Sequence, residues 1–206
     1  MKKKLINILC LSGIISIIFY LLHDIIGSIN YPGYDWMNSA VSDLTAVDSP
    51  SFVKAIGYVT IYKIFSSICS ILLCILIKKE NKLLRIGVYL FSIMNLISAI
   101  GYALFPLTSS GYDGSIESFI HVYVLTILVV LLSIVSLILI SIGSFKGKHK
   151  VLGVLSIISL VLMFVGAIGS NSCPKEVFGI FERFSTYSAV IFTGILGIYG
   201  YRVFKE

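Results

Sequence analysis

The sequence predicts an all-α membrane protein, a polytopic bundle of six transmembrane helices with a polar cap loop at its outer end. Of its 206 residues, 57% are hydrophobic and 13% are charged, and the mean hydropathy is +1.00. A soluble domain of this composition would leave too much apolar surface uncovered. The apolar residues also form long runs separated by short polar connectors. In lipid such runs must be helices, because an open sheet would leave backbone groups unpaired.

The first apolar run covers residues 5–29 and follows three lysines, as the apolar segment of a signal peptide does. The run is longer than such a segment and contains no A-x-A cleavage site. Leu9 also precedes Cys10, at the position where a lipoprotein signal has a small residue. We therefore expect this run to stay attached to the chain and to span the membrane.

Five further runs complete the predicted bundle, and each ends in charged residues or in turn residues such as Pro and Gly. All are long enough to cross a hydrocarbon core of about 30 Å. We treat the whole chain, residues 1–206, as a single domain. The five runs are residues 52–77, 83–107, 116–145, 151–170 and 178–204.

The charges are sorted between the two ends of these runs. By the positive-inside rule, the end that carries the lysines is cytoplasmic, which places both termini inside the cell and the protein in the plasma membrane. This sorting also disfavours nucleic acid as a partner, because no basic face is formed. The basic end carries Lys2, Lys3, Lys4, Lys78, Lys79, Lys82, Arg85, Lys146, Lys148, Lys150, Arg202 and Lys205, and the other end carries Asp24, Asp35, Asp43, Asp48, Asp113, Glu117, Glu176 and Glu182.

Residues 30–51 form the longest polar interval in the chain. They contain three aspartates and Trp36, the only tryptophan, but no Lys or Arg. Long, acidic loops are commonly functional or disordered, and the aromatic residues favour order. We therefore predict a cap that folds over the outer end of the bundle, with Trp36 or the tyrosines Tyr31 and Tyr34 buried in its underside.

Ionisable side chains recur about one turn inside the outer ends of the predicted helices. A charged group costs about 2.5 to 3.5 kcal/mol at a helix centre on insertion scales, so such groups are expected to face the bundle interior and mark a site. With two residues of the cap, the candidate pocket residues are His23, Asp24, Ser42, Asp43, Lys63, Glu117, His121, Glu182 and Arg183.

Several candidates also have a purely structural explanation. Asp24, Glu117 and Lys54 lie near the interface, where side chains can reach water by snorkelling. Lys63 lies about 13 Å deeper than Lys54, so snorkelling explains it poorly. Asn95, near mid-membrane, is expected to join helices rather than to bind a ligand.

The other candidates have alternatives of the same kind. His121 fits either a pocket residue or a core histidine bonded to the cap. Glu182 and Arg183 fit ligand binding or a structural ion pair equally well. Adjacent helical residues project about 100° apart, so each of the two needs a further partner. For Arg183 that partner could be Asp24 or Glu117.

Three motifs resemble the DUF998 family of six-span membrane proteins. They are the cap string YPGYDWMNSAVSDLTAVDSPS, the segment GYALFP followed by a Gly-containing loop and IESFIHVYV, and FGIFERFSTYS. The family pattern implies a Ser-containing motif after the first helix, then G-x-F-P, a His on the fourth helix and a Glu-Arg pair on the sixth. These correspond here to Ser42 with Asp43 and Leu44, Phe105 with Pro106, His121, and Glu182 with Arg183.

This sequence departs from the family pattern because three residues separate Gly101 from Phe105, where G-x-F-P has one. The resemblance covers essentially the whole chain. It implies the fold but no activity, because none is assigned to the family.

Three classes of function fit the sequence. We place first a binding or transport module whose outward-facing pocket holds a lipid headgroup or a small anionic molecule. The second is an intramembrane hydrolase, with His23, His121 and an Asp such as Asp24 or Asp43 holding a metal, or with a Ser42 nucleophile and a His121 base. The third is a structural or regulatory partner of another membrane protein.

The metal version of the hydrolase is disfavoured, and we expect no metal site. No H-x-x-x-H or H-E-x-x-H pair occurs, and two histidines supply fewer ligands than a metal site normally has. Membrane lipid is the expected partner, while the sequence leaves cofactors and oligomeric state open. We expect His121, Glu182 and Arg183 to converge with Ser42 and Asp43 in the outer third of the bundle, where the Arg183 fork would meet a phosphate or carboxylate.

Overall fold

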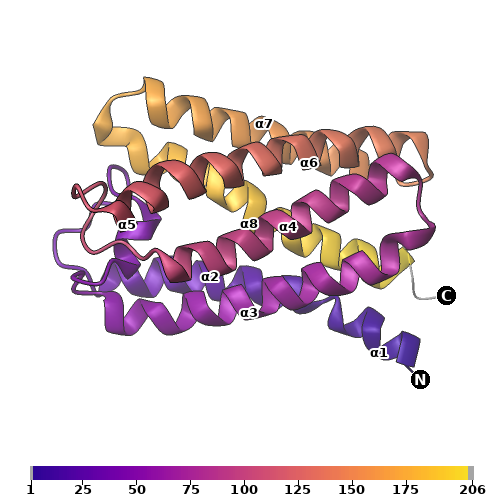
Figure 1. The fold of residues 1–206 in the computed structure, drawn as a ribbon, viewed down its shortest axis with the longest axis horizontal. Coiled ribbons are helices and arrows are strands. Elements are labelled where there is room, and N and C mark those ends of the chain that lie inside the picture. Colours follow the sequence, from indigo (N-terminus) through magenta and orange to yellow (C-terminus); the bar gives the residue numbers. More distant parts are fainter. Residues whose placement is uncertain (1, 204–206) are drawn as a thin grey trace.

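The computed structural model describes residues 2–203, with the side chains of residues 5–202. Within that range all regular structure is helical, and the long helices run up and down in one bundle (Figure 1). This confirms the predicted fold class. The long helices are α2 (Ser12–Ile29), α3 (Phe52–Leu76), α4 (Lys82–Leu104), α6 (Thr126–Lys146), α7 (Lys150–Ser172) and α8 (Phe178–Val203), and the short α1 (Lys2–Leu9) precedes them.

Five stretches of the described chain are long and apolar enough to cross a membrane, and they match the first five predicted spans. They are Leu5–Ile29, Phe52–Lys79, Lys82–Leu104, Ile116–Lys146 and Lys150–Ser172.

The sixth predicted run forms α8, which is not among those five stretches because it is more polar. The helix nevertheless packs against α7, α2 and α3, and its Arg183 is only 7% exposed. Its neighbours therefore cover the charge that makes it polar. The predicted end of this run at Phe204 lies outside the described residues.

Two predicted spans are not the continuous α-helices that we expected. The first is interrupted at Cys10 and Leu11, between α1 and α2. There the Cys10 carbonyl accepts a hydrogen bond from the Cys69 thiol (3.4 Å) and lies so close to Gly197 that a Cβ on that glycine would be 2.4 Å away. The fourth begins as α5 (Ile116–Phe119), continues as the π-helical turn η3 (Ile120–Leu125), and only then becomes α6.

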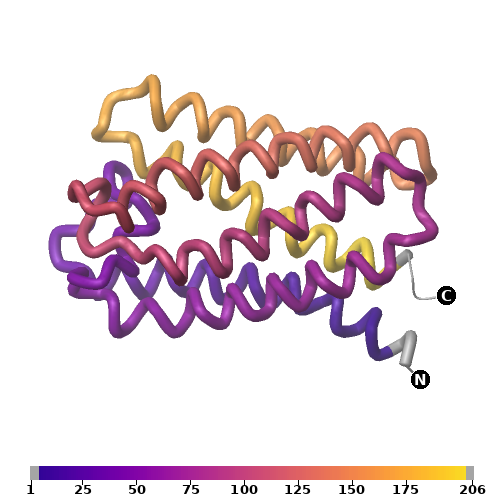
Figure 2. The backbone as a smooth tube through the Cα atoms, in the orientation of Figure 1, coloured from indigo at the N-terminus to yellow at the C-terminus, as the bar shows by residue number. Residues whose placement is uncertain are grey.

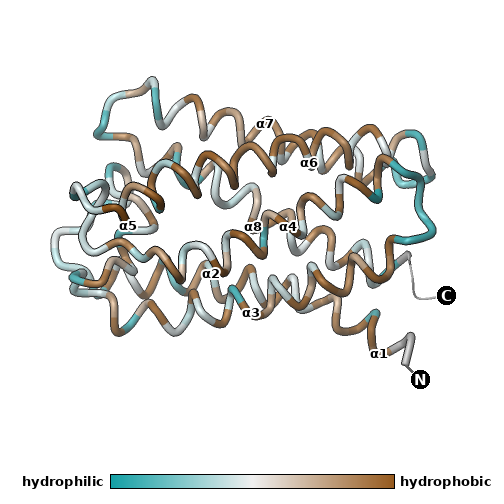
Figure 3. Tube along the Cα trace, in the orientation of Figure 1, coloured by the Kyte–Doolittle hydropathy of each residue, from teal (hydrophilic) through white to brown (hydrophobic). Residues whose placement is uncertain are grey.

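The inner half of the bundle is held by apolar packing. Fully buried residues such as Leu84, Phe91, Leu137 and Phe192 form one cluster there. A Cβ on Gly143 would lie 2.3 Å from the Leu84 nitrogen, so this glycine lets α6 approach α4 closely. Apolar residues run along the helices and polar residues gather at both ends, as Figure 3 shows.

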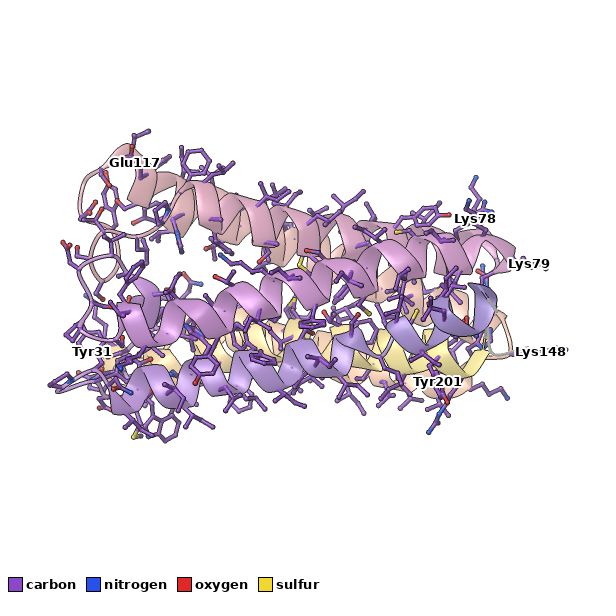
Figure 4. The ribbon with its side chains drawn as sticks, turned by 90° about the horizontal axis from the view of Figure 1, so that it is seen from below. Tyr31, Lys78, Lys79, Glu117, Lys148 and Tyr201 are labelled. Atoms are coloured by element: carbon purple, nitrogen blue, oxygen red, sulfur yellow. The ribbon has the colours of Figure 1, made fainter. Side chains whose placement is uncertain are left out.

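The two ends of the bundle differ in charge as the sequence predicted. Figure 4 places Lys78, Lys79 and Lys148 at one end and Glu117 at the other. The described part of α1 and the last turns of α8 lie at the lysine end (Figure 2). The side chains of Lys2, Lys3 and Lys4, and Lys205, are outside the described part.

Asn95 joins helices at mid-bundle, as predicted. Its amide nitrogen donates to the Ser70 hydroxyl (3.0 Å) on α3 and to the Thr193 hydroxyl (3.2 Å) on α8. A buried amide with two such partners ties α4 to its neighbours.

The cap, residues 30–51, is folded against the opposite end of the bundle. Its short 3-10 helix η1 (Val41–Thr45) buries Val41 and Leu44 completely, and Leu44 packs on Gly27 of α2. The backbone of Val47 and Asp48 bonds to Leu107 and Thr108, beyond α4 (2.8 and 2.9 Å). The tyrosines are partly buried, whereas Trp36 is 54% exposed. The prediction of an ordered cap is thus confirmed, but aliphatic residues rather than Trp36 anchor it.

Candidate functional site

An ion pair between α8 and α2 organises the outer half of the bundle. The Arg183 Nε and Nη2 atoms donate to the two carboxylate oxygens of Asp24, each at 2.9 Å. Both side chains are buried. This bidentate geometry is the strongest arrangement for an arginine and a carboxylate. Of the two partners that the sequence allowed for Arg183, the structure therefore shows Asp24 and not Glu117.

The remaining donors of Arg183 hold the cap. Nη1 donates to the carbonyls of Trp36 (2.7 Å) and Ser39 (3.2 Å), and to Gly179 (3.0 Å) on its own helix. Nη2 also donates to the Tyr34 hydroxyl (2.7 Å). The guanidinium is thus fully engaged by protein groups. We expected its fork to meet a ligand, but in the structure the fork binds Asp24 instead.

Gly179, one turn before Arg183, makes this contact with the cap possible. A Cβ at this position would lie 2.5 Å from the carbonyl oxygens of both Trp36 and Ser39. In addition, the Ile180 amide donates to the Met37 carbonyl (3.2 Å). The beginning of α8 therefore docks directly on the cap backbone.

Two tyrosines extend this network. Tyr187 lies one turn beyond Arg183 on α8, and its hydroxyl donates to Asp24. Tyr34 links Arg183 to the rest of the cap, because its hydroxyl accepts a hydrogen bond from Arg183 and donates one to the Ala40 carbonyl (2.9 Å). Burial raises the pKa of Tyr34 above its ordinary value, so this hydroxyl stays protonated and able to donate.

Besides Asp24, two carboxyl groups lie where the cap meets the bundle: Glu182 on α8 and Asp43 in η1. Glu182 accepts a hydrogen bond from the Val41 amide (3.1 Å), which fixes η1 to α8. Asp43 accepts from the Ala40 amide (3.2 Å). Burial is the largest influence on Asp43 and raises its pKa, against the lowering effect of hydrogen bonds from Ser110 and from backbone amides.

His121 lies in the π-helical turn η3 and lines the same cavity as Glu182 and Asp43. Its Nδ1 is 2.7 Å from the Phe105 carbonyl, and its ring packs on Tyr102 with centroids 4.5 Å apart. Because a carbonyl can only accept, Nδ1 carries the proton of this bond and Nε2 is left for another partner. Single π turns are frequent at functional sites, and this one orients His121.

His23 and Lys63 lie deeper, on α2 and α3. The His23 side chain is 2% exposed, and neither ring nitrogen has a hydrogen-bond partner among the described residues. The Lys63 side chain is partly buried, and within residues 5–202 its ammonium forms no ion pair. Lys63 lines the same cavity as both His23 and His121.

These groups line one cavity of about 1650 Å³. Of the predicted site residues, the cavity brings together His23, Ser42, Asp43, Lys63, His121 and Glu182. Asp24 and Arg183 form the buried pair that fixes its wall. Glu117 and Lys54 are exposed elsewhere, which agrees with the interfacial explanation for both.

The cavity changes character with depth. Its outer end is lined by the polar groups named above, and its continuation toward mid-membrane mostly by aliphatic side chains, with Ser67, Asn95 and Ser133 among them. Two of the aliphatic residues, Ile64 and Leu131, are also more than half exposed on the outer surface of the bundle. The cavity therefore has a polar end and an apolar wall that reaches the lipid-facing surface.

Several residues of this site escaped the sequence reasoning. Tyr187 shares a helical face with Arg183 at i+4, and this spacing was a usable signal. Gly179 and the carbonyls of Trp36, Ser39 and Phe105 had no signal, because their role depends on tertiary contact. Among residues 5–202, no three His, Cys, Asp or Glu side chains are grouped as a metal site requires.

Comparison with curated proteins and with solved structures gives no match. One family model does match, and it covers residues 14–199, which is most of the chain and includes every group of the site. The family is described as a protein of unknown function. The chain belongs to this family, DUF998.

Proposed function

We propose that this protein binds an amphipathic lipid, with the polar headgroup beneath the cap and the acyl chains along the apolar wall. The observation that carries the proposal is the cavity itself, polar at its outer end and mostly aliphatic toward mid-membrane. At about 1650 Å³ it exceeds the roughly 300 to 1,000 Å³ of typical small-molecule sites. A molecule with a long apolar part would fill it.

The outward exposure of the apolar wall favours entry from the bilayer. Ile64 on α3, Ile100 on α4 and Leu131 on α6 line the cavity and also face outward. A lipid could move between the bilayer and the cavity along this surface without exposing its chains to water. A small water-soluble anion would gain no binding energy from contact with these apolar side chains, so we favour the lipid over the small anionic molecule.

The proposal includes an orientation: six spans in the plasma membrane, with both termini in the cytoplasm. It is supported by Lys78, Lys79 and Lys148 at the inner end, with Glu117 at the other (Figure 4). The native Cys173 is exposed at the acidic end. It should therefore react with a membrane-impermeant maleimide on intact cells, whereas Lys148→Cys in a Cys173→Ser background should not. Labelling of Lys148→Cys from outside would contradict this topology.

Lipid binding is tested by native mass spectrometry of the full chain purified in a mild detergent. We expect a bound lipid of stoichiometry near one. Ala99→Phe should lower its occupancy, because Ala99 lines the cavity. Ile158→Phe, on the lipid-facing surface of α7 and away from the cavity, is the control. Equal lipid loss in both variants, or no bound lipid in the wild type, would refute the proposal.

A further inference from the structure

Four ionisable side chains in the polar part of the cavity differ in their distance from the outer end of the bundle and in the hydrogen-bonding groups that they leave free. Glu182 lies about one turn inside the outer end of α8, and His121 lies near the beginning of the fourth span. His23 lies about 9 Å below the outer end of α2, at 1.5 Å per residue. Lys63 begins deeper on α3, but helical side chains lean toward the helix N-terminus, which here is the outer end. Its ammonium therefore approaches the level of His23.

The deeper pair consists of donors without a protein acceptor. Lys63 carries three N–H groups, and in either neutral tautomer one ring nitrogen of His23 carries a proton. Neither His23 nitrogen is bonded within the described part of the chain. A buried imidazole that is left unpaired costs free energy, so an unpaired one that lines the same cavity as Lys63 indicates a missing acceptor. The acceptor that suits an ammonium and an N–H together is an anionic oxygen, such as that of a phosphate.

The outer pair consists of acceptors. The Oε2 atom of Glu182 accepts from the Val41 amide, and the bonds within residues 5–202 leave Oε1 unpaired. His121 donates through Nδ1 to Phe105, so in its neutral form Nε2 can only accept. A ligand amine would satisfy both groups. The charged residues that line the cavity are also balanced, with Lys63 and Lys175 against Asp43 and Glu182.

We propose that the cavity is specific for a zwitterionic phospholipid with a primary amine, of the phosphatidylethanolamine type. His23 and Lys63 bind its phosphate, and Glu182 and His121 bind its amine nearer to the cap. This assignment rests on the lipid-binding function proposed above and adds the headgroup class. A headgroup with no phosphate would leave Lys63 and His23 unpaired, and one with no amine would leave Glu182 unpaired.

The test uses the full chain, stripped of lipid in detergent and then equilibrated with equal amounts of three dioleoyl lipids: phosphatidylethanolamine, phosphatidylglycerol and diacylglycerol. Native mass spectrometry reads the lipid retained. We expect phosphatidylethanolamine to be favoured over diacylglycerol on the order of tenfold, since charge-assisted hydrogen bonds hold the phosphate. Phosphatidylglycerol should lie between the two.

Substitutions assign the two halves of the headgroup. Lys63→Met should abolish the preference for a phosphate, and Lys63→Arg should retain it. Glu182→Gln keeps an acceptor for the Val41 amide but should remove the preference for phosphatidylethanolamine over phosphatidylglycerol. Lys54→Met is the matched control, because Lys54 is exposed on the same helix as Lys63 and does not line the cavity. Each variant must show wild-type elution and Trp36 emission, and Lys63→Gln replaces Lys63→Met if that variant misfolds.

The outcomes separate this inference from the proposed function. If all three lipids bind equally well, or if Lys54→Met acts like Lys63→Met, the headgroup assignment is overturned while lipid binding stands. If no lipid binds, both are overturned. Glycerophosphoethanolamine, which lacks the acyl chains, should compete poorly; competition as strong as that of the lipid would show a site for a soluble phosphate and would also overturn the assignment.

Discussion

The outer and inner halves of this bundle hold their helices together in different ways. In the inner half, glycines and apolar side chains pack closely, and its basic residues lie on the surface at the end. In the outer half, a smaller apolar cluster that includes Leu44 and Tyr62 is joined by a buried Arg183–Asp24 pair, an attached cap and an amphipathic cavity. Buried charge and unfilled volume contribute less to stability than close packing does. The outer half therefore has the composition of a binding region, and the inner half that of a scaffold.

The largest expected effect comes from removing Arg183. Arg183→Ala leaves the buried Asp24 carboxylate with only the hydroxyls of Tyr187 and Ser28 as partners in the described residues, and it leaves the cap carbonyls without their Arg183 donor. We therefore expect a loss of about 3 to 5 kcal/mol of unfolding free energy. Arg183→Lys keeps the charge but not the fork and should lose most of the same stability. Thermal unfolding in detergent measures both. Arg85→Ala, at the exposed inner end, should change stability by less than about 0.5 kcal/mol. Equal effects of Arg183→Ala and Arg85→Ala would contradict the contrast between the halves.

A smaller effect is expected at Gly179. Gly179→Val places atoms within 2.5 Å of the Trp36 and Ser39 carbonyls, and overpacking of this kind costs about 1 to 3 kcal/mol. The cap should detach while the bundle stays folded, so limited proteolysis from outside should cut residues 35–49 faster. Gly57→Val is the control, because a Cβ at Gly57 meets nothing within 4 Å. Unchanged cutting in Gly179→Val would show that α8 does not hold the cap.

At the boundary between the halves, Asn95→Ala should cost about 1 to 2 kcal/mol, because it removes two buried hydrogen bonds to Ser70 and Thr193. Unlike Gly179→Val, it should lower the thermal stability of the whole chain without faster cutting in the cap. Selective cutting of the cap in this variant would show that Asn95 stabilises the outer half rather than the whole bundle.

The smallest effect is the pH dependence of the cap. Burial raises the pKa of Asp43, so the folded cap favours the protonated acid. The stability from this shift is fully present below about pH 3.9, the ordinary Asp value, and is lost as pH rises through the raised pKa. The backbone amides of residues 40–46 should therefore be less protected from hydrogen exchange, relative to their intrinsic exchange rates, as pH rises toward 7.

Asp43→Asn, which cannot ionise, should flatten this pH profile. Asp113 acts in the opposite sense, since hydrogen bonds from Ser115 and Ser118 lower its pKa to about 2. Its contribution is lost only as pH falls below about 4 toward 2, so measurements between pH 4 and 7 exclude the effect of Asp113. If Asp43→Asn leaves the pH profile unchanged, Asp43 does not cause the pH dependence of the cap.

Sequence patterning predicted the scaffold well because apolar run length and charge sorting are local properties. It missed the break at Cys10 and the π turn at Ile120–Leu125, since both depend on contacts with other helices. In the site, charge at an apolar depth correctly identified Asp24, His121 and Arg183 as interior groups. It offered Asp24 and Glu117 as partners of Arg183 without choosing between them. It could not predict the bonds to the Trp36 and Ser39 carbonyls, because carbonyl positions follow from the fold of the cap. Trp36 shows the reverse error, since its aromatic side chain suggested burial but only its carbonyl is used.

Photocrosslinking tests the central claim, a lipid held with its headgroup under the cap, most directly. A phosphatidylethanolamine with a diazirine on its headgroup would be added to the purified chain, irradiated and mapped by peptide mass spectrometry. We predict crosslinks on the peptides that contain Lys63, His121 and Glu182, reduced in Ala99→Phe and unchanged in Ile158→Phe. Crosslinks spread over the lipid-facing surfaces of α6 and α7, with none under the cap, would contradict it.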